Sequence, residues 1–494
     1  MPMTLDTGRL EMRKADEKTL FESGSIRDIM VKLALPTVLG QMITVIYNMA
    51  DTFFVGMLSD DAKMTAVTVA MPCFMILSAI SNLFGIGGAS AISRAMGSGD
   101  RERAENEASF SFWGALVSGS IYIILVAIFV HPLVDILGGS NPIVHIYTVS
   151  YILTAVCAGG IMTVMGAFFS HLLRSEGRGF EASFGIVLGG ILNIILDPIF
   201  MFFVMPEGME VAGAAAATAI SNMVSMVYFA LVIFKRRSES VISISPRKAI
   251  AGIKNQKDIL SSGLPAFCMT LCENVSYAVL DSLMAGFGIT VQAGVGVAKK
   301  INMLAHSIVR GMSQGMLPMI AYSYASGNRE RMKKASRASS MFSVLSALIC
   351  MAVSLIFADG LADIFLEAGS ESAMHAARIL RIFALGAPFS AFAYTSISFF
   401  QATGHGGRSL SLALMRKGIL DIPLMFILVR LFGAYGAAAG TPIADGICAV
   451  AASFMMVSFM KRECGFKYRD KSIEHVQNRN RVEKDMPMTA KAVI

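Results

Sequence analysis

The chain has 494 residues, of which 54% are hydrophobic and only 16% are charged, and its mean hydropathy is +0.61. Because soluble proteins carry about 25% charged residues, this composition excludes an ordinary soluble protein and indicates that lipid solvates much of the surface. The net charge of +7 reflects an excess of basic residues, which we expect to orient the protein in the membrane and to contact anionic lipid headgroups. The sequence contains no basic helix with interleaved aromatic residues, which is the pattern that would indicate a nucleic-acid partner.

Apolar stretches recur along almost the whole chain, and each is long enough to cross a hydrocarbon core of roughly 30 Å, which takes about 20 residues. A charged leader over residues 1–27 precedes the first stretch and has no small-residue cleavage pattern, so this stretch is predicted to be a membrane span rather than a removed signal peptide. We predict an all-α membrane protein with twelve transmembrane helices, at residues 30–58, 64–94, 108–130, 143–173, 180–205, 211–235, 258–286, 291–323, 338–358, 373–403, 409–432 and 435–460.

The charges between the spans predict the orientation of the chain, because basic residues close to spans are retained on the cytoplasmic side. With the N-terminus inside, the inner turns and the tail hold most of the basic residues, namely Arg94, Arg101, Arg103, Arg174, Arg178, Lys235, Arg236, Arg237, Arg247, Lys248, Lys254, Lys257, Arg329, Arg331, Lys333, Lys334, Arg408, Lys461 and Arg462. The outer turns hold mainly acids, namely Asp60, Asp61, Asp135, Glu207, Glu210, Asp359, Asp363, Glu367 and Glu371. We therefore expect a multi-pass protein of the cell (inner) membrane with both termini in the cytoplasm.

The two halves of the chain repeat one another at a shift of about 228 residues. The first helix of each half opens on the same dipeptide, Leu35-Pro36 and Leu264-Pro265. Further matches join 45–51 (VIYNMAD) to 275–281 (VSYAVLD), 99–103 (GDRER) to 327–331 (GNRER), 190–193 (GILN) to 418–421 (GILD), and 213–222 (GAAAATAISN) to 436–445 (GAAAGTPIAD). Since six spans is an even number, both halves enter the membrane in the same sense, and a pseudo-twofold axis along the membrane normal is expected between them.

This repeat predicts the domain organisation and a cavity between two six-helix bundles. We name the first bundle the N-lobe (28–235, helices 1–6) and the second the C-lobe (258–461, helices 7–12). A polar cytoplasmic linker (236–257) is expected to join them. The leader (1–27) and a charged tail (462–494), which lacks an apolar period, are expected to lie in the cytoplasm.

Ionisable side chains inside spans cost about 2.5 to 3.5 kcal/mol each on insertion scales, so each one needs an explanation. Six acids are in this position, namely Asp51, Asp197, Glu273, Asp281, Asp421 and Asp445. Each can be a residue that snorkels to the membrane surface, or a carboxylate bonded to neighbouring amides and hydroxyls. This structural interpretation is strongest for Asp51 and Asp281, which lie towards the outer ends of their helices.

Asp197 is the acid that most strongly indicates a functional site. Asn193 precedes it by one helical step, and Pro198 follows it and weakens the local backbone hydrogen bonds. Thr218 lies among small residues that let helices approach closely, and Asp51 lies in the same bundle. Two carboxylates, an amide and a hydroxyl offer the oxygen ligands that Na⁺ prefers, and two acids in a poorly hydrated cavity can equally hold a proton. Both coupling ions remain open at this point.

Glu273 lies roughly midway along the seventh predicted helix, at the depth of a central cavity, where a cationic ligand is its natural partner. Asp281 on the same helix is the second candidate for the substrate cavity. The eighth helix carries Lys299, Lys300 and Arg310. These cations are expected to snorkel, or to neutralise Glu273 or Asp281 in structural pairs.

Six stretches of the sequence resemble the multidrug and toxin extrusion (MATE) family, and most closely a bacterial branch of it. They are LPTVLGQMITVIYNMADTFFVG (35–56), GGASAISRAMGSGD (87–100), LNIILDPIF (192–200), GAAAATAISN (213–222), GLPAFCMTLCEN (263–274) and QGMLPMIAYSYASGN (314–328). The resemblance covers roughly residues 25–462. It implies an antiporter with two six-helix lobes around a V-shaped cavity, which expels cationic or aromatic drugs as H⁺ or Na⁺ returns.

The same resemblance implies roles for individual residues. It places the ion-coupling site on the first, fifth and sixth helices, at Asp51, Asn193, Asp197 and Thr218. It assigns helix bending to Pro36 and the C-lobe acid to Glu273. Some Na⁺-coupled members carry an acid in the tenth helix, but residues 387–400 (APFSAFAYTSISFF) contain none, so a Na⁺ cluster there is not expected.

Two other functions make different demands on the sequence. A lipid-linked precursor flippase of the related superfamily would need an anionic pyrophosphate site, and few cavity arginines are evident. A membrane-embedded transferase or hydrolase would need a paired-aspartate metal motif, a GxSxG elbow or a catalytic histidine with partners, none of which stands out.

The seven cysteines are scattered and indicate neither disulfides nor a metal site. We therefore predict a transporter rather than an enzyme, monomeric and without a cofactor, whose partners are small molecules and membrane lipids.

Overall fold

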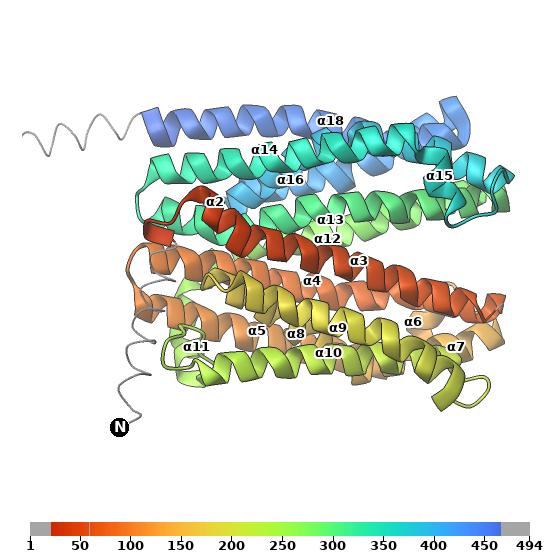
Figure 1. Cartoon of the computed structure of the whole chain (residues 1–494). Helices are drawn as coiled ribbons and strands as arrows, with labels where there is room; N and C mark the ends of the chain where they lie inside the picture. The colour runs from red at the N-terminus through yellow and green to blue at the C-terminus, as the bar shows by residue number, and fades with distance from the viewer. Residues whose placement is uncertain (1–20, 59, 466–494) are drawn as a thin grey trace, which may run out of the picture. The chain divides into compact units, whose positions relative to one another are not determined.

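The computed structural model describes residues 21–58 and 60–465, and all regular secondary structure within these ranges is helical (Figure 1). Most of the predicted leader and all but the first residues of the predicted tail lie outside the described residues. The chain divides into a larger compact unit up to residue 449 and a smaller one from residue 450 onwards. Both predicted lobes, apart from the end of the last helix, belong to the larger unit.

The described part of the N-lobe contains nine α-helical segments and three π-helical turns. The α-helices are α2 (Ile26–Ile29), α3 (Leu35–Gly56), α4 (Asp61–Gly97), α5 (Arg101–Ile128), α6 (Val130–Ile136), α7 (Pro142–Ile152), α8 (Gly160–Ser175), α9 (Gly179–Ile199) and, at the end of the lobe, α10 (Glu210–Lys235). The π-helical turns are η1 (Met30–Ala34), η2 (Leu153–Ala158) and η3 (Phe200–Val204). Each turn continues an α-helix without a loop, so α2, η1 and α3 form the first predicted span.

The linker and the C-lobe follow. The linker forms α11 (Pro246–Gly252) and the 3₁₀ turn η4 (Ile253–Asn255). The C-lobe consists of α12 (Gln256–Ala285), α13 (Ile289–Ala325), α14 (Arg329–Ile356), α15 (Ala358–Asp363), α16 (Glu371–Ala402), α17 (Gly406–Leu414), the π-helical turn η5 (Met415–Ile419) and α18 (Asp421–Gly465).

All twelve predicted spans are helical, but not all are simple spans. By length and composition, the described residues contain eight helices able to cross a membrane, or nine if a bent pair is counted as one span. That pair is the fourth predicted span, where α7 with η2 meets α8 at 46°. The last two predicted spans form one continuous helical segment with a kink at Gly433, whose φ of 64° favours glycine. The helices α12 and α13 are not among those eight helices, because polar and charged side chains interrupt their apolar sequence.

The turns that repeat in sequence also repeat in conformation. Asp100 caps α5 by accepting a hydrogen bond from the Arg103 N–H at 2.9 Å, and Asn328 caps α14 by accepting one from the Arg331 N–H at 3.0 Å. The preceding glycines, Gly99 and Gly327, have φ values of 80° and 77°. The GDRER and GNRER sequences therefore build the same helix start in the two halves.

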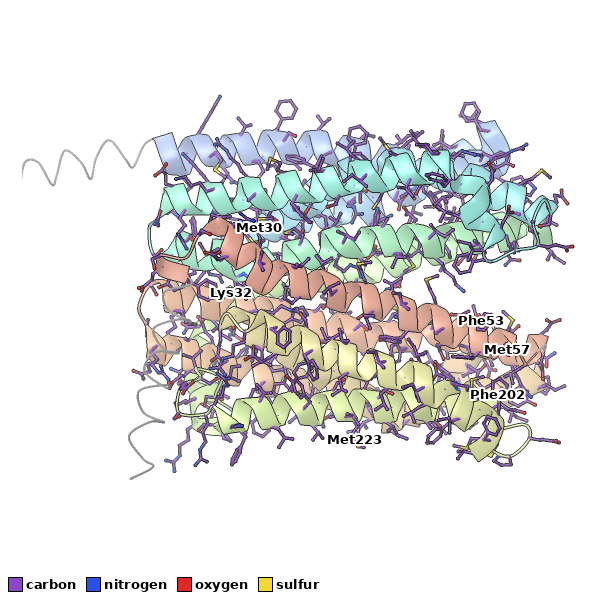
Figure 2. All side chains as sticks on the ribbon, viewed as in Figure 1. Met30, Lys32, Phe53, Met57, Phe202 and Met223 are labelled. Carbon is purple, nitrogen blue, oxygen red and sulfur yellow. The ribbon has the colours of Figure 1, made fainter. Side chains whose placement is uncertain are left out.

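Many large apolar side chains lie on the surface of the helices. Phe53 and Met57 at the end of α3, and Met223 on α10, are exposed (Figure 2). Phe53 exposes 65% of its surface. Scattered apolar residues are normal on any protein, but bands of them on many long helices require lipid as the solvent.

The two lobes meet at one end of the bundle, which we name the basic end because the turns after α4, α8, α13 and α16 carry its arginines. At this end, glycines allow the helix backbones of the two lobes to approach each other closely. A Cβ atom on Gly263 of α12 would lie 1.9 Å from the carbonyl oxygen of Leu83 on α4. One on Gly311 of α13 would lie 2.4 Å from the Cα atom of Val38 on α3. In Figure 1, α3 (red) runs between α13 (green) and α9 (yellow), and it contacts both.

The linker is more ordered than its polar sequence indicated. Pro246 begins α11, a position where its fixed φ favours a helix and its missing N–H costs nothing. The segment packs on α5, where Trp113 Nε1 donates to the carbonyl of Ile244 at 3.1 Å and Ser109 Oγ donates to that of Ser245 at 2.6 Å. The linker is thus attached to the N-lobe.

Candidate functional site

Local helix structure brings Asn193 and Asp197 to one face of α9. The two residues are four apart, so their side chains lie one above the other. Pro198 has no N–H, which removes one hydrogen bond from the helix, and the π-helical turn η3 begins at Phe200. The site therefore lies where the regular helix is loosened.

The predicted N-lobe residues form one buried cluster. Asn193 Nδ2 donates to Asp197 Oδ1 at 2.9 Å and to Thr218 Oγ1 of α10 at 3.2 Å. Asp197 is fully buried, and Asn193 and Asp51 are nearly so. The Asp51 and Asp197 carboxyl groups lie close enough for their charges to interact. Tyr47 of α3 interacts electrostatically with both.

The acids of this cluster are incompletely satisfied. Asp51 Oδ1, Asp197 Oδ2 and Asn193 Oδ1 are buried and accept no hydrogen bond from the protein. Neither carboxylate belongs to an ion pair among the described residues, although Lys300 of the C-lobe acts electrostatically on Asp51. Buried carboxylate oxygens without partners are costly. The cluster can lower this cost by binding a small cation.

A cavity of about 220 Å³ lies between the lobes. Asn193 and Thr218 line its N-lobe side, whereas Asp51 and Asp197 are not among the residues that line it. Glu273 and Arg310 line its C-lobe side, where Arg310 donates to the Glu273 carboxylate at 2.9 Å. The cavity thus joins the N-lobe cluster to the predicted C-lobe acid.

Two of the expected structural pairs are confirmed. Arg310 pairs with Glu273, and Lys299 pairs with Asp281 at 2.5 Å. Asp281 is not among the residues that line the cavity, and 43% of its side chain is exposed. Lys300 forms no ion pair within the described part of the chain. Of the two acids predicted for the substrate cavity, the structure therefore brings only Glu273 to it.

Two buried cations were missed by the sequence reasoning. Arg416 and Lys417 lie on η5, and each exposes 1% of its surface. Arg416 pairs with Asp445 at 2.8 Å, and Lys417 pairs with Asp421 at 3.2 Å. A signal was present, because the two cations interrupt an apolar span one helical turn before Asp421.

Two arginines line the cavity, and one of them was expected elsewhere. Arg174, predicted in an inner turn, is buried at the end of α8 and lines the cavity together with Arg310. Its guanidinium contacts His171 Nδ1 at 3.0 Å and donates to Ser170 Oγ at 3.3 Å, and its Nε has no partner. Arg174 forms no ion pair with any acid in the described ranges. Packing by its neighbours, rather than its place in the sequence, buries this side chain.

These features define a polytopic helical membrane protein with two repeated bundles around a polar cavity, the architecture of a secondary transporter. The MatE family model matches residues 36–199 and 265–427, one segment in each half. The chain therefore belongs to the MatE family.

Known relatives support this assignment. The multidrug export protein MepA of Staphylococcus haemolyticus (strain JCSC1435) is 28% identical over 449 residues, which cover 91% of this chain and 97% of that protein. A crystal structure of MATE in complex with MaL6 is 27% identical, with a TM-score of 0.81 over 90% of this chain and 99% of the other. The outward-facing conformation of a multidrug resistance MATE family transporter of the MOP superfamily is 26% identical, with a TM-score of 0.81 over 90% and 98%. The predicted family, bacterial branch and fold class are confirmed.

Proposed function

We propose that this transporter is a cation-coupled antiporter, which exports amphipathic, mostly cationic drugs or toxins by alternating access. One observation carries the proposal: the lobes differ in how their buried acids are neutralised. In the C-lobe, Glu273, Asp421 and Asp445 each pair with a cation of the chain. In the N-lobe, Asp51 and Asp197 have no such partner among the described residues. The N-lobe therefore depends on a cation from solution.

The coupling site comprises Asp51, Asn193, Asp197 and Thr218, and the ion is H⁺ or Na⁺. A proton or Na⁺ would remove the repulsion between the two carboxylates and satisfy the free oxygens. Asp51 lies on α3, which contacts α9 and α13 and begins at Pro36 next to the π-helical turn η1. Ion binding would allow α3 to bend near Pro36 and the N-lobe to repack.

The substrate site includes Glu273. A cationic drug in the cavity would compete with Arg310 for the Glu273 carboxylate. Tyr47 and Tyr394 also line the cavity and offer aromatic faces for stacking and cation–π contacts. Asp281 is engaged by Lys299 away from the cavity, which favours a structural role for it.

The orientation follows from the charges. Arginines gather in the turns of the basic end, so this end faces the cytoplasm of the cell (inner) membrane and both termini lie there. In that orientation the lobes are in contact on the cytoplasmic side. The working unit is taken to be a monomer in lipid, since one chain supplies both walls of the cavity.

A lipid-linked precursor flippase is the second candidate, and Arg174 is the observation that favours it. A buried guanidinium without an acid partner in a cavity is suited to a phosphate group. Transfer of a fluorescent polyprenyl pyrophosphate between the leaflets of proteoliposomes would support the flippase. Efflux of an organic cation without such transfer would support the antiporter.

The decisive experiment is efflux of a fluorescent cation from proteoliposomes, with a Na⁺ gradient and a pH gradient imposed separately. We expect one of the two gradients to drive efflux against a concentration difference. Reciprocity requires that drug binding weaken ion binding by the same coupling free energy, typically about 1–3 kcal/mol. Drug titration of purified protein should therefore release the coupling ion. Efflux that neither gradient accelerates would contradict the proposal.

A further inference from the structure

The N-lobe cluster has a structural counterpart in the C-lobe. The repeat matches Asn193 with Asp421 and Thr218 with Thr441. In the N-lobe, Asn193 donates to Thr218 Oγ1 at 3.2 Å, and in the C-lobe, Thr441 Oγ1 donates to Asp421 Oδ1 at 2.9 Å. The same two helical positions therefore meet in both lobes.

A third pair of positions extends the correspondence. The repeat matches Tyr47 with Tyr277 in the first helix of each half. Tyr47 interacts electrostatically with the acids of the N-lobe cluster. The Tyr277 ring lies 5.5 Å from the Lys417 ammonium, which is bonded to Asp421. Each lobe thus brings a tyrosine, a threonine and a buried acid together on matched helices.

The two sites differ in their cation. In the C-lobe, Asp421 is fully buried and accepts hydrogen bonds from Lys417 at 3.2 Å and from Ser276 at 2.6 Å, in addition to the one from Thr441. The ammonium group of Lys417 belongs to the chain, so this carboxylate is neutralised without an ion from solution.

The sequence explains why only one lobe has this lysine. Lys417 matches Gly189, the residue directly before the repeated GIL tripeptide. A Cβ atom on Gly189 would lie 2.1 Å from Ser225 Oγ, so a side chain at this position would have to displace the Ser225 hydroxyl. The N-lobe acid instead lies one turn later, at Asp197, whose counterpart in the C-lobe is the buried Met425.

We propose that Lys417 is a built-in cation, which holds in the C-lobe the position that an exchangeable monovalent cation takes in the N-lobe. Ion exchange is thereby confined to the N-lobe, and the ratio of ions to drug is set by that lobe alone. Replacing Lys417 with a neutral residue should convert Asp421, Thr441 and Ser276 into a second site for Na⁺ or H⁺. The inference rests on the proposed coupling site, since it takes that site as the reference.

The test measures cation binding to purified full-length protein, by ²²Na⁺ binding and by proton uptake in weakly buffered detergent solution. The background is Asp197→Asn, in which the N-lobe site is removed. In this background, we expect Lys417→Met to restore binding of one cation per protein. Adding Asp421→Asn should abolish the restored binding, and Lys417→Arg, which keeps the charge, should not restore it.

Correct folding is checked by a single symmetric peak in size-exclusion chromatography, and Lys417→Gln provides a second neutral variant. A folded Lys417→Met or Lys417→Gln protein that binds neither Na⁺ nor H⁺ would overturn the inference and make the Lys417–Asp421 pair purely structural. If both neutral variants fail to fold while Lys417→Met with Asp421→Asn folds and the Lys417→Arg protein also folds, no solution cation replaces the ammonium, and the inference is equally overturned.

The proposed function has a separate control in the same experiment. If the wild-type protein binds no cation, the N-lobe coupling site is wrong. Cation binding gained by the Lys417 variants could still be measured and interpreted in that case, because it depends on Asp421 and not on Asp197.

Discussion

Single side chains decide which of the buried carboxylates respond to ions. Asp197 is fully buried, and among the described residues its side chain bonds only to the uncharged amide of Asn193, whereas Glu273 is bonded to the guanidinium of Arg310. A buried carboxylate without a cation binds one readily, but an ion-paired carboxylate gives up its partner only to a competing cation. We therefore expect Asp197 to respond to the coupling ion and Glu273 to the drug.

The change Asp197→Asn should remove coupled transport and leave folding intact, because it keeps the shape of the side chain and deletes its charge. A lost coupling energy of about 1–3 kcal/mol corresponds to a loss of about 5- to 150-fold in gradient-driven efflux. Efflux from proteoliposomes is the measurement. Asp281→Asn is the matched control, since this acid lies outside the cavity lining, and it should retain efflux. Wild-type efflux in the Asp197 variant would rule out the N-lobe site.

The change Glu273→Gln should weaken export of cationic compounds more than that of neutral ones, because the lost charge acts on the charge of the substrate. It also leaves Arg310 without its acid, and because the Arg310 side chain is 36% exposed, solvent screens much of the resulting loss of stability. Combining Glu273→Gln with Arg310→Gln should recover much of the stability but not the preference for cations. Thermal unfolding and paired efflux assays check the two effects. If the double variant recovers the preference, Glu273 acts only as a structural partner of Arg310.

A further residue-scale prediction concerns Arg174. If its guanidinium contacts substrates, Arg174→Gln should reduce export of a rhodamine with a free carboxylate by about 10-fold, in line with about 1.5–3 kcal/mol for a charge-assisted hydrogen bond. Export of the matching methyl ester should change little. Equal losses for both dyes would indicate that Arg174 serves only to hold α8 through His171 and Ser170.

The sequence predicted part of this site. An acid inside a membrane span is conspicuous because its insertion costs free energy, and this made Asp51 and Asp197 candidates. Helical spacing and small neighbouring residues then added Asn193 and Thr218 as candidates. Arg416 and Lys417 were missed, because an adjacent basic pair flanked by glycine does not break the apolar average of its span. Whether a charge is paired depends on distances between helices, and hydropathy contains no such distances. The same reason explains why Asp281 was expected at the cavity.

At the scale of helices, close backbone contact holds the lobes together at the basic end. Gly311 and Gly315 of α13 face Val38 of α3 and Ala34 of η1, and a Cβ atom on either glycine would lie within 2.5 Å of a backbone Cα atom. The positions of the helices followed from apolar length and turn signals. The 46° bend before α8, the kink at Gly433 and the helix α11 were not predicted. Gly433 and Pro246 permit the last two locally, but apolar length and turn signals do not show that the chain uses them in this way.

The change Gly311→Ala tests the helix contact. The added methyl group should separate α13 from α3 and cost about 1–3 kcal/mol, as overpacking does. Gly296→Ala is the matched control, since nothing lies within 4 Å of its Cβ position on the same helix. We expect a lower melting temperature and faster labelling of a cysteine at Gln314 from the cytoplasmic side in the Gly311 variant alone. Equal behaviour of the two alanine variants would show that the lobes do not depend on this contact.

At the scale of the whole transporter, Arg94 of α4 connects the N-lobe to the C-lobe. Its guanidinium donates to the carbonyls of Asp258, Gln401 and Ala402 and to Ser262 Oγ, at 3.2–3.3 Å. All four acceptors belong to α12 or α16, so this single buried side chain spans the two bundles. Alternating access requires these bonds to break each time the basic end opens. Their strength therefore sets part of the balance between the two states of the transporter.

The change Arg94→Lys should shift that balance, because an ammonium group cannot reach four acceptors in the directions that the planar guanidinium serves. Losing about 1.5–3 kcal/mol of charged hydrogen bonding would favour opening by about 10- to 150-fold. Spin labels at Ser98 and Ser326, in a background without native cysteines, would report the distance between the lobes at the basic end. Arg101→Lys is the control, since Arg101 bonds to Glu105 on its own helix and to the linker carbonyl of Ser240. We expect longer distances in the Arg94 variant and wild-type distances in the Arg101 variant. An unchanged distribution in the Arg94 variant would mean that the glycine contacts alone keep the basic end closed.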